Sequence, residues 1–131
     1  MQFLMPVRSL NSSVIRWPDL DEVREAIDLW ARGEVRSHPD LLRLGYFGSA
    51  ARGDWGVGSD LDLVAVVSES GQAFERRGLS WDLSSLPVAS DLLVYTESEW
   101  SAVQKGGGRF ARTLSRETVW IYTKGSTDCA D

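Results

Sequence analysis

Two aspartates stand two residues apart where an apolar run of the sequence begins. Asp60 and Asp62 open the segment Leu61–Val67, which the pattern predicts to be a strand, so both side chains leave the same face. Such a pair is often no more than a solvated strand end or a turn. Here it leads into a predicted buried strand, where an unpaired charge is costly without a cation or solvent. The pair therefore favours a metal site, and its oxygen ligands favour Mg²⁺ or Mn²⁺.

A glycine–serine pair ends the preceding predicted strand, Leu41–Phe47. Gly48 and Ser49 turn into a short helical sequence, whose first N–H groups are free to bind phosphate, and glycine allows a close approach. Ser49 could instead cap that turn, which is the more common role for such a serine. Arg52 could assist phosphate binding or clamp a neighbouring carboxylate. The pair is thus a candidate phosphate cradle.

Asp91 is a third acidic candidate because it also stands at the start of an apolar strand, Leu92–Tyr95. It would reach the same point as the other two aspartates if the two strands are neighbours. The competing interpretation is a plain aspartate at a strand end. Glu97 and Asp82 are weaker candidates, since neither introduces a buried run.

The elements expected around these residues are helices and a small sheet. An apolar stripe after Pro18 predicts a helix that ends near Gly33, and Ser13–Trp17 could form a short edge strand. The stripe consists of Leu20, Val23, Ile27 and Trp30. Strands are predicted at Leu41–Phe47, Leu61–Val67, Asp91–Tyr95 and Thr118–Tyr122, and helices at Gln72–Arg77, Glu97–Lys105 and Arg109–Ser115. We therefore expect a mixed α/β domain with helices flanking the sheet.

Composition narrows the function classes. The 131 residues suit one domain, expected over residues 1–123 with a disordered tail at 124–131. The net charge of −5 argues against a nucleic-acid partner or an anionic membrane. A single cysteine and a single histidine exclude an internal disulfide and a Cys- or His-based zinc site. No apolar run approaches the roughly 20 residues of a membrane helix, and no secretory signal is visible, so we expect a cytoplasmic protein.

Other conspicuous residues have ordinary explanations. Arg76 and Arg77 form too short a basic run for a nucleic-acid patch and predict a solvated helix face. His38 has no companion and is expected at the surface. Trp55, in the glycine-rich loop, could stack on a base or a partner, or serve as a hydrophobic plug.

The acidic and glycine elements together resemble the polymerase-β-like nucleotidyltransferase superfamily, and in particular its minimal nucleotidyltransferases. Gly48-Ser49, ten intervening residues and then Asp60-x-Asp62 reproduce the spacing of that family's motif. The form Gly-Ser-x-Ala-Arg-Gly followed by Ser-Asp-x-Asp-Leu is similar to the small, free-standing members. The family's third acid matches Asp91, and the resemblance runs from about Leu44 to Tyr122.

The resemblance implies a nucleotidyltransferase fold and a Mg²⁺-dependent enzyme that moves a nucleoside monophosphate, AMP from ATP in the first instance, to a hydroxyl. Asp60 and Asp62 would hold two divalent ions, and Asp91 would complete the ligand set of the ion nearest the acceptor. One ion would lower the pKa of that hydroxyl, and the other would neutralise the pyrophosphate. The β- and γ-phosphates would lie at the glycine–serine pair. The nucleotide-binding residues carried over from the motif are Gly48, Ser49, Arg52 and Ser59.

Partners follow from the same resemblance. Minimal members commonly pair with a small helical HEPN protein, and some act as antitoxins that adenylylate it. A HEPN-type partner or a protein acceptor is therefore implied, and the net charge of −5 fits a protein acceptor better than a polynucleotide. Two other functions stay open: a non-catalytic binding or inhibitory module, and a small-molecule, antibiotic-type transferase that acts as a dimer. Three intact carboxylates argue against the first of these.

Overall fold

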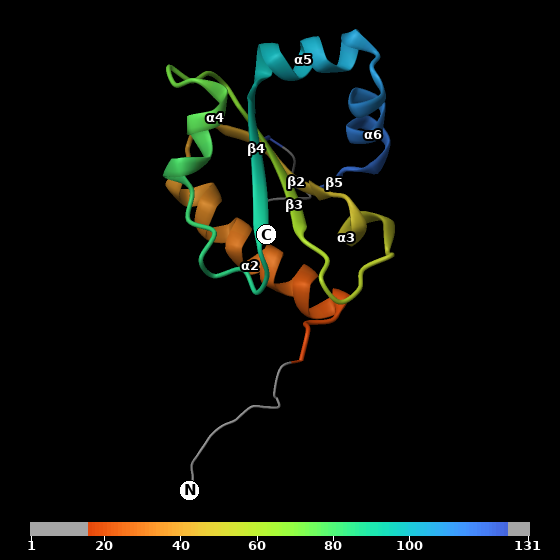
Figure 1. Ribbon diagram of the computed structural model, residues 1–131. Coiled ribbons are helices and arrows are strands. Elements are labelled where there is room, and N and C mark those ends of the chain that lie inside the picture. The colour runs from red at the N-terminus through yellow and green to blue at the C-terminus, as the bar shows by residue number, and fades with distance from the viewer. Residues whose placement is uncertain (1–15, 126–131) are drawn as a thin grey trace, which may run out of the picture.

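The computed structural model describes residues 16–125, which are built around a four-stranded sheet (Figure 1). The strands are β2 (Leu41–Phe47), β3 (Leu61–Val67), β4 (Ser90–Thr96) and β5 (Val119–Thr123). Their order across the sheet is β4-β3-β2-β5, in which β2 is antiparallel to β3 and β5 whereas β3 and β4 are parallel. The predicted mixed α/β architecture is confirmed.

Helices connect the strands and cover the sheet. They are α2 (Leu20–Ser37), α3 (Ser49–Arg52), α4 (Phe74–Arg77), the 3₁₀ turn η1 (Gly78–Ser80), α5 (Glu97–Gly106) and α6 (Arg109–Glu117). Figure 1 shows α2 along one side of the sheet and α6 on the other. The predicted helices and strands between residues 18 and 122 are all present, and only their ends differ.

The hydrophobic core lies between α2 and the sheet. Val23 and Ile27 of α2 are fully buried, and Trp30 is nearly so. The β3 members of this core are Leu61, Leu63, Ala65 and Val67, which share one face because side chains alternate along a strand. Val64 and Val66 point to the opposite face and are also buried. This strand is therefore covered on both faces, as its apolar sequence predicts.

Helix α2 begins with a capping box and runs further than predicted. The Asp19 carboxylate accepts the Glu22 N–H at 2.9 Å, and the Glu22 carboxylate accepts the Asp19 N–H at 2.9 Å. The prediction that the helix ends at Gly33 is wrong, because the helix continues to Ser37. A glycine inside a helix costs only about 1 kcal/mol relative to alanine. The packing of the additional turn, in which Glu34 is buried, offsets that cost.

His38 is packed against an aromatic ring, so its predicted surface position is wrong. Its imidazole stacks on the Trp81 indole with ring centroids 3.8 Å apart. Its Nε2 atom lies 3.3 Å from the Glu34 carboxylate. Trp81 belongs to the distant segment between β3 and β4, and no local sequence signal places it over the end of α2.

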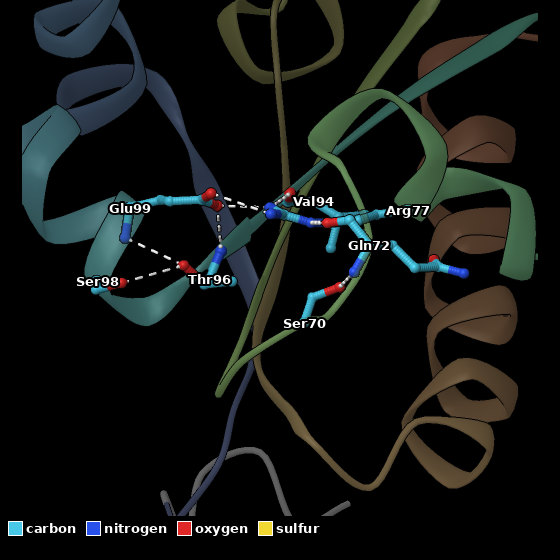
Figure 2. Close-up of polar contacts among 7 residues, drawn as sticks. All are labelled: Ser70, Gln72, Arg77, Val94, Thr96, Ser98 and Glu99. Atoms are coloured by element: carbon cyan, nitrogen blue, oxygen red, sulfur yellow. Dashed lines mark hydrogen bonds and ion pairs between the residues drawn. The ribbon is translucent and has the colours of Figure 1, made fainter.

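One buried arginine holds the crossover between the parallel strands β3 and β4. Arg77 is 7% exposed and donates to the Glu99 carboxylate at 2.5 and 3.0 Å (Figure 2). It also donates to the carbonyls of Gln72 at 3.0 Å and Val94 at 3.1 Å. The prediction of a solvated face for Arg77 is wrong, because these acceptors compensate the burial of its charge.

The two ends of the chain are only partly described. The edge strand predicted at Ser13–Trp17 lies mostly outside the described residues, and so do residues 126–131 of the predicted tail. Lys124 is anchored, since its N–H donates to the Leu42 carbonyl at 2.8 Å. Across the described residues, the helices are all too short or too polar to traverse a bilayer.

The Arg77–Glu99 pair predicts an acid-sensitive contribution to stability. Hydrogen bonds from Arg77 and then from the Thr96 N–H lower the pKa of Glu99 from 4.5 to about 2. A carboxyl whose pKa falls on folding stabilises the fold above its ordinary pKa, and this contribution is lost as the pH falls towards 2. We expect Glu99→Gln to lower the free energy of unfolding by about 1 kcal/mol near neutral pH, a modest value because the side chain is 41% exposed.

Urea unfolding between neutral pH and about pH 3 measures this effect, and the deficit of Glu99→Gln should shrink in acid. Glu97→Gln removes an exposed carboxylate from the same helical turn and is the matched control. An equal loss in both variants, or a deficit that persists in acid, would contradict the assignment.

Candidate active site

The pairing of β3 with β4 brings Asp62 and Asp91 side by side. The two strands are parallel, and Asp62 is the direct partner of Asp91 in their register. Adjacent strands lie about 4.8 Å apart, and directly paired residues point to the same face. The two carboxylates therefore share one side of the sheet. The sequence left open whether Asp91 starts a strand next to Asp62, and the structure shows that it does.

Gly48 packs against the Asp62 carboxylate and could not carry a side chain. It follows β2, whose last residue, Phe47, pairs with Asp62 in the antiparallel register. A Cβ atom built on Gly48 would lie 2.3 Å from Asp62 Oδ2, well inside contact distance. The φ angle of Gly48 is also +76°, which an L side chain rarely adopts. Glycine at this position thus places the loop directly against the acidic side chain.

Asp62 lies in a negative electrostatic environment. Its own burial raises the pKa of its carboxyl most, and the charges of Asp91 and Asp60 raise it further. Arg52 opposes these effects, whereas Glu117 adds to them. Asp62 is half-buried, while Asp60 and Asp91 are exposed. The three predicted aspartates therefore interact, and a bound cation would relieve their repulsion.

The donor chemistry of this cluster fits a hard divalent cation. Three aspartates offer only carboxylate oxygens, which Mg²⁺ and Mn²⁺ prefer. Among residues 16–125, no group of three or more Asp, Glu, His or Cys side chains is already arranged to hold a metal ion. The cluster thus has suitable donors in one place without a preformed coordination sphere.

Glu117 is a site residue that the sequence analysis missed. Its Oε1 atom accepts the Gly48 N–H at 2.8 Å and an Arg52 Nη1 donor at 3.2 Å. One backbone donor expected for phosphate is thus bonded to a carboxylate of the chain itself. Glu117 ends α6 and lies 69 residues from Gly48 in the sequence, so no spacing rule connects the two.

The contacts of Ser49 and Arg52 bear on the two alternatives that the sequence left open for the cradle. Ser49 does not cap α3, because Gly48 occupies the N-cap position and no side-chain cap bond forms there. Arg52 acts as a clamp for carboxylates, since it pairs with Asp54 at 3.1 Å and with Glu117 at 3.2 Å. The Ser49 hydroxyl is therefore not committed to capping, whereas Arg52 already has two anionic partners.

The rest of the glycine-rich loop is held by hydrogen bonds. The Ser59 hydroxyl accepts the Gly56 N–H at 3.0 Å and closes the turn that precedes Asp60. Trp55 Nε1 donates to the Pro18 carbonyl at 2.9 Å, and its ring packs against the core. Trp55 therefore serves as the hydrophobic plug, and the stacking role proposed as its alternative has no support here.

Helix α2 also holds the same loop in place. Arg24 Nη2 donates to the Ala50 carbonyl at 2.9 Å and so fixes the short helix α3. The loop is consequently tied to α2 through Arg24, to the residue Pro18 before α2 through Trp55, and to α6 through Glu117. Its position next to Asp62 depends on contacts from both helices.

A family model described as a nucleotidyltransferase domain matches residues 30–121. The chain belongs to this nucleotidyltransferase family. The matched segment contains the glycine–serine pair, all three aspartates and Glu117. The resemblance identified from the motif is thereby confirmed. Within this nucleotidyltransferase domain, the register of β3 with β4 brings Asp91 next to Asp62.

Solved structures show the same fold. A Sulfolobus solfataricus protein assigned as a nucleotidyltransferase is similar to this nucleotidyltransferase domain, with 20% identity, a TM-score of 0.58, and coverage of 80% of this chain and 84% of that chain. A toxin–antitoxin structure with AMP-PNP has 13% identity and a TM-score of 0.45, over 75% of this chain and 74% of that one. The first similarity shows the fold alone. No curated protein matches the sequence.

The close approach of Gly48 to Asp62 predicts different costs for two glycine substitutions. Gly48 and Gly53 both have positive φ, at +76° and +89°, but a Cβ on Gly53 would meet nothing within 4 Å. Gly53→Ala should therefore cost about 1–2 kcal/mol from backbone strain alone. Gly48→Ala should cost about 3 kcal/mol or more, because Asp62 or the loop must also move. Urea denaturation of both variants measures the difference, and equal costs would show that Gly48 does not contact Asp62 as described.

Proposed function

We propose that this nucleotidyltransferase domain is catalytically active and transfers a nucleoside monophosphate, AMP from ATP in the first instance, to a hydroxyl acceptor. The observation that carries the proposal is the direct pairing of Asp62 with Asp91 beside the Gly48 loop. Three aspartates that repel one another destabilise the fold unless they bind a cation, and a catalytic site would use that cation. Burial and the neighbouring carboxylates disfavour the ionised form of Asp62, and a cation bound at the site would compensate this cost.

The three aspartates have distinct places in the proposed site. Asp62, half-buried against Gly48, is the fixed ligand, while the exposed Asp60 and Asp91 can adjust to a cation. A bound Mg²⁺ or Mn²⁺ would supply charge neutralisation for the leaving group and a lower pKa for the acceptor hydroxyl. The contribution of the chain is to hold the acceptor, cation and phosphates in one orientation, which is the main source of catalysis in phosphoryl transfer.

The nucleotide would be held by the loop between β2 and β3. Among the described residues, neither the Ser49 nor the Ala50 N–H donates a hydrogen bond, and the Ser49 hydroxyl is also free of a described partner. These N–H and O–H groups can donate to phosphate oxygens. Arg52, whose Nε and Nη1 atoms already bond Asp54 and Glu117, can add the donors of its Nη2 atom. The Gly48 N–H would have to be shared with Glu117 or released by it, and Ser59 would act by shaping the turn before Asp60.

The acceptor is proposed to be a protein hydroxyl, with a small helical HEPN-type protein as the partner. The support for this is the resemblance to minimal nucleotidyltransferases and the net charge of −5, which disfavours a polynucleotide. In that arrangement the chain would act as an antitoxin-like modifier of its partner. A non-catalytic binding module is the second candidate, favoured by the bond from the Gly48 N–H to Glu117, which occupies a phosphate donor.

Divalent cations provide the first test. We expect Mg²⁺ to raise the melting temperature of the wild-type chain by several degrees, because a bound cation relieves the repulsion among the aspartates. Asp60→Asn/Asp62→Asn removes two ligands and should abolish that shift. Glu25→Gln/Asp28→Asn removes two exposed charges from α2 and should retain it. Calorimetry with no shift in the wild type, or with the same shift in both double variants, would count against the metal site.

Transfer itself provides the second test. ATP labelled on its α-phosphate should label the protein encoded by the adjacent reading frame when both are incubated with Mg²⁺, and Asp62→Asn should remove the label. Label on a small molecule would instead support an antibiotic-type transferase. Absence of label with every nucleoside triphosphate, combined with tight partner binding, would replace the enzyme by the binding module.

A further inference from the structure

Helix α6 presents three arginines on one exposed face. Arg109, Arg112 and Arg116 stand at positions i, i+3 and i+7, which lie on the same side of an α-helix. All three are exposed. Ala111 and Leu114, at 8% and 0% exposure, fix the opposite side of α6 against the domain. Packing therefore holds the arginine face outward.

This face lines a cavity that adjoins the candidate active site. The cavity has a volume of ≈ 270 Å³ and is lined by Arg109, Arg112, Thr113, Arg116 and Glu117. Glu117 is also the residue that accepts hydrogen bonds from the Gly48 N–H and from Arg52. One side chain thus belongs both to the cavity wall and to the glycine–serine cradle, and Figure 1 shows α6 and α3 on the same side of the sheet.

Within residues 16–125, no ion pair neutralises the charges of the three arginines. In the part of the chain that the structure describes, the ion pairs of arginine involve only Arg16, Arg52 and Arg77. Arg112 donates to the Gly107 carbonyl, which leaves its positive charge uncompensated. In a chain with a net charge of −5, such a concentration of free cationic groups around one cavity points to an anionic ligand.

We propose that the α6 cavity binds phosphate groups of a substrate, next to the carboxylate cluster. Guanidinium groups bind phosphate oxygens in a planar, bidentate geometry, and the Thr113 hydroxyl provides a further donor. The pocket of ≈ 270 Å³ is open to solvent, and its lining residues all belong to α6, so the three guanidinium groups can reach phosphate groups of a ligand that extends beyond it. The arginines of α6 would then bind the anionic phosphates, and the three aspartates beside them would bind the cation.

The phosphates could belong to the polyphosphate end of the nucleotide or to the acceptor, and in both cases the inference rests on the proposed function for its biological meaning. Phosphate binding itself does not depend on turnover. Calorimetric titration with inorganic tripolyphosphate, without divalent cation and at low salt, therefore tests the cavity separately from catalysis. A chain that binds tripolyphosphate but transfers nothing would contradict the proposed function alone.

The decisive comparison uses two double variants with the same change in charge. Arg112→Gln/Arg116→Gln should weaken tripolyphosphate binding by about tenfold or more, since each charge-assisted bond is worth about tenfold in affinity. Arg32→Gln/Arg36→Gln, on the exposed surface of α2, should stay within about twofold of the wild type. Arg116→Gln alone should also weaken binding while leaving the Arg112 bond to Gly107 intact, which controls for damage to the turn before α6.

Titration with ATP and AMP then distinguishes the two sources. A parallel loss of ATP affinity in Arg112→Gln/Arg116→Gln, with AMP unaffected, assigns the cavity to the polyphosphate of the nucleotide. Loss of tripolyphosphate binding with unchanged ATP affinity assigns it to a phosphate on the acceptor. Tripolyphosphate that fails to bind the wild type, or binds both double variants equally, would overturn the proposal.

Discussion

The candidate site depends on the absence of a Cβ atom at Gly48. Any other residue would place that atom 2.3 Å from Asp62 Oδ2, in a backbone conformation that L side chains avoid. Because the glycine lies directly against the carboxylate, the glycine-rich loop after β2 and the acidic strand β3 meet at contact distance. The parallel register of β3 and β4 then adds Asp91 beside Asp62, so two separate backbone constraints converge on one point.

The electrostatics of this point are unfavourable until something binds there. Burial and the neighbouring acids raise the pKa of Asp62, and only Arg52 opposes them. Glu117 increases the negative charge while it holds the loop through Gly48. Functional sites typically contain such destabilising interactions, which the packing of the rest of the protein compensates. The arginine face of α6, next to Glu117, places positive charge beside the negatively charged aspartates.

Local patterns predicted the parts of the structure that local physics determines. The apolar run in Leu61–Val67 predicted a central strand, and the stripe from Leu20 to Trp30 predicted the core helix. The glycines after Phe47 predicted the irregular loop that lies against Asp62. The helix end at Gly33 was wrong because tertiary packing overrode a weak propensity.

The residues that were missed or misplaced depend on contacts between distant segments. Arg77 is buried among the Glu99 carboxylate and the carbonyls of Gln72 and Val94. His38 is partly buried because its ring stacks on Trp81. Glu117 reaches Gly48 across 69 residues. These pairings arise from the topology of the sheet, and a single sequence contains no periodicity or spacing that predicts them.

The most direct test of the central claim is paramagnetic broadening by Mn²⁺ in the amide NMR spectrum of the wild-type chain. If Asp60, Asp62 and Asp91 converge beside Gly48, substoichiometric Mn²⁺ should first broaden the amide signals of Gly48, Asp62 and Asp91. The signals of the acidic first turn of α2, which contains Asp21 and Glu22, should remain sharp at the same concentration. Uniform broadening across all acidic surfaces, or sharp signals at Gly48 and Asp62, would contradict the account.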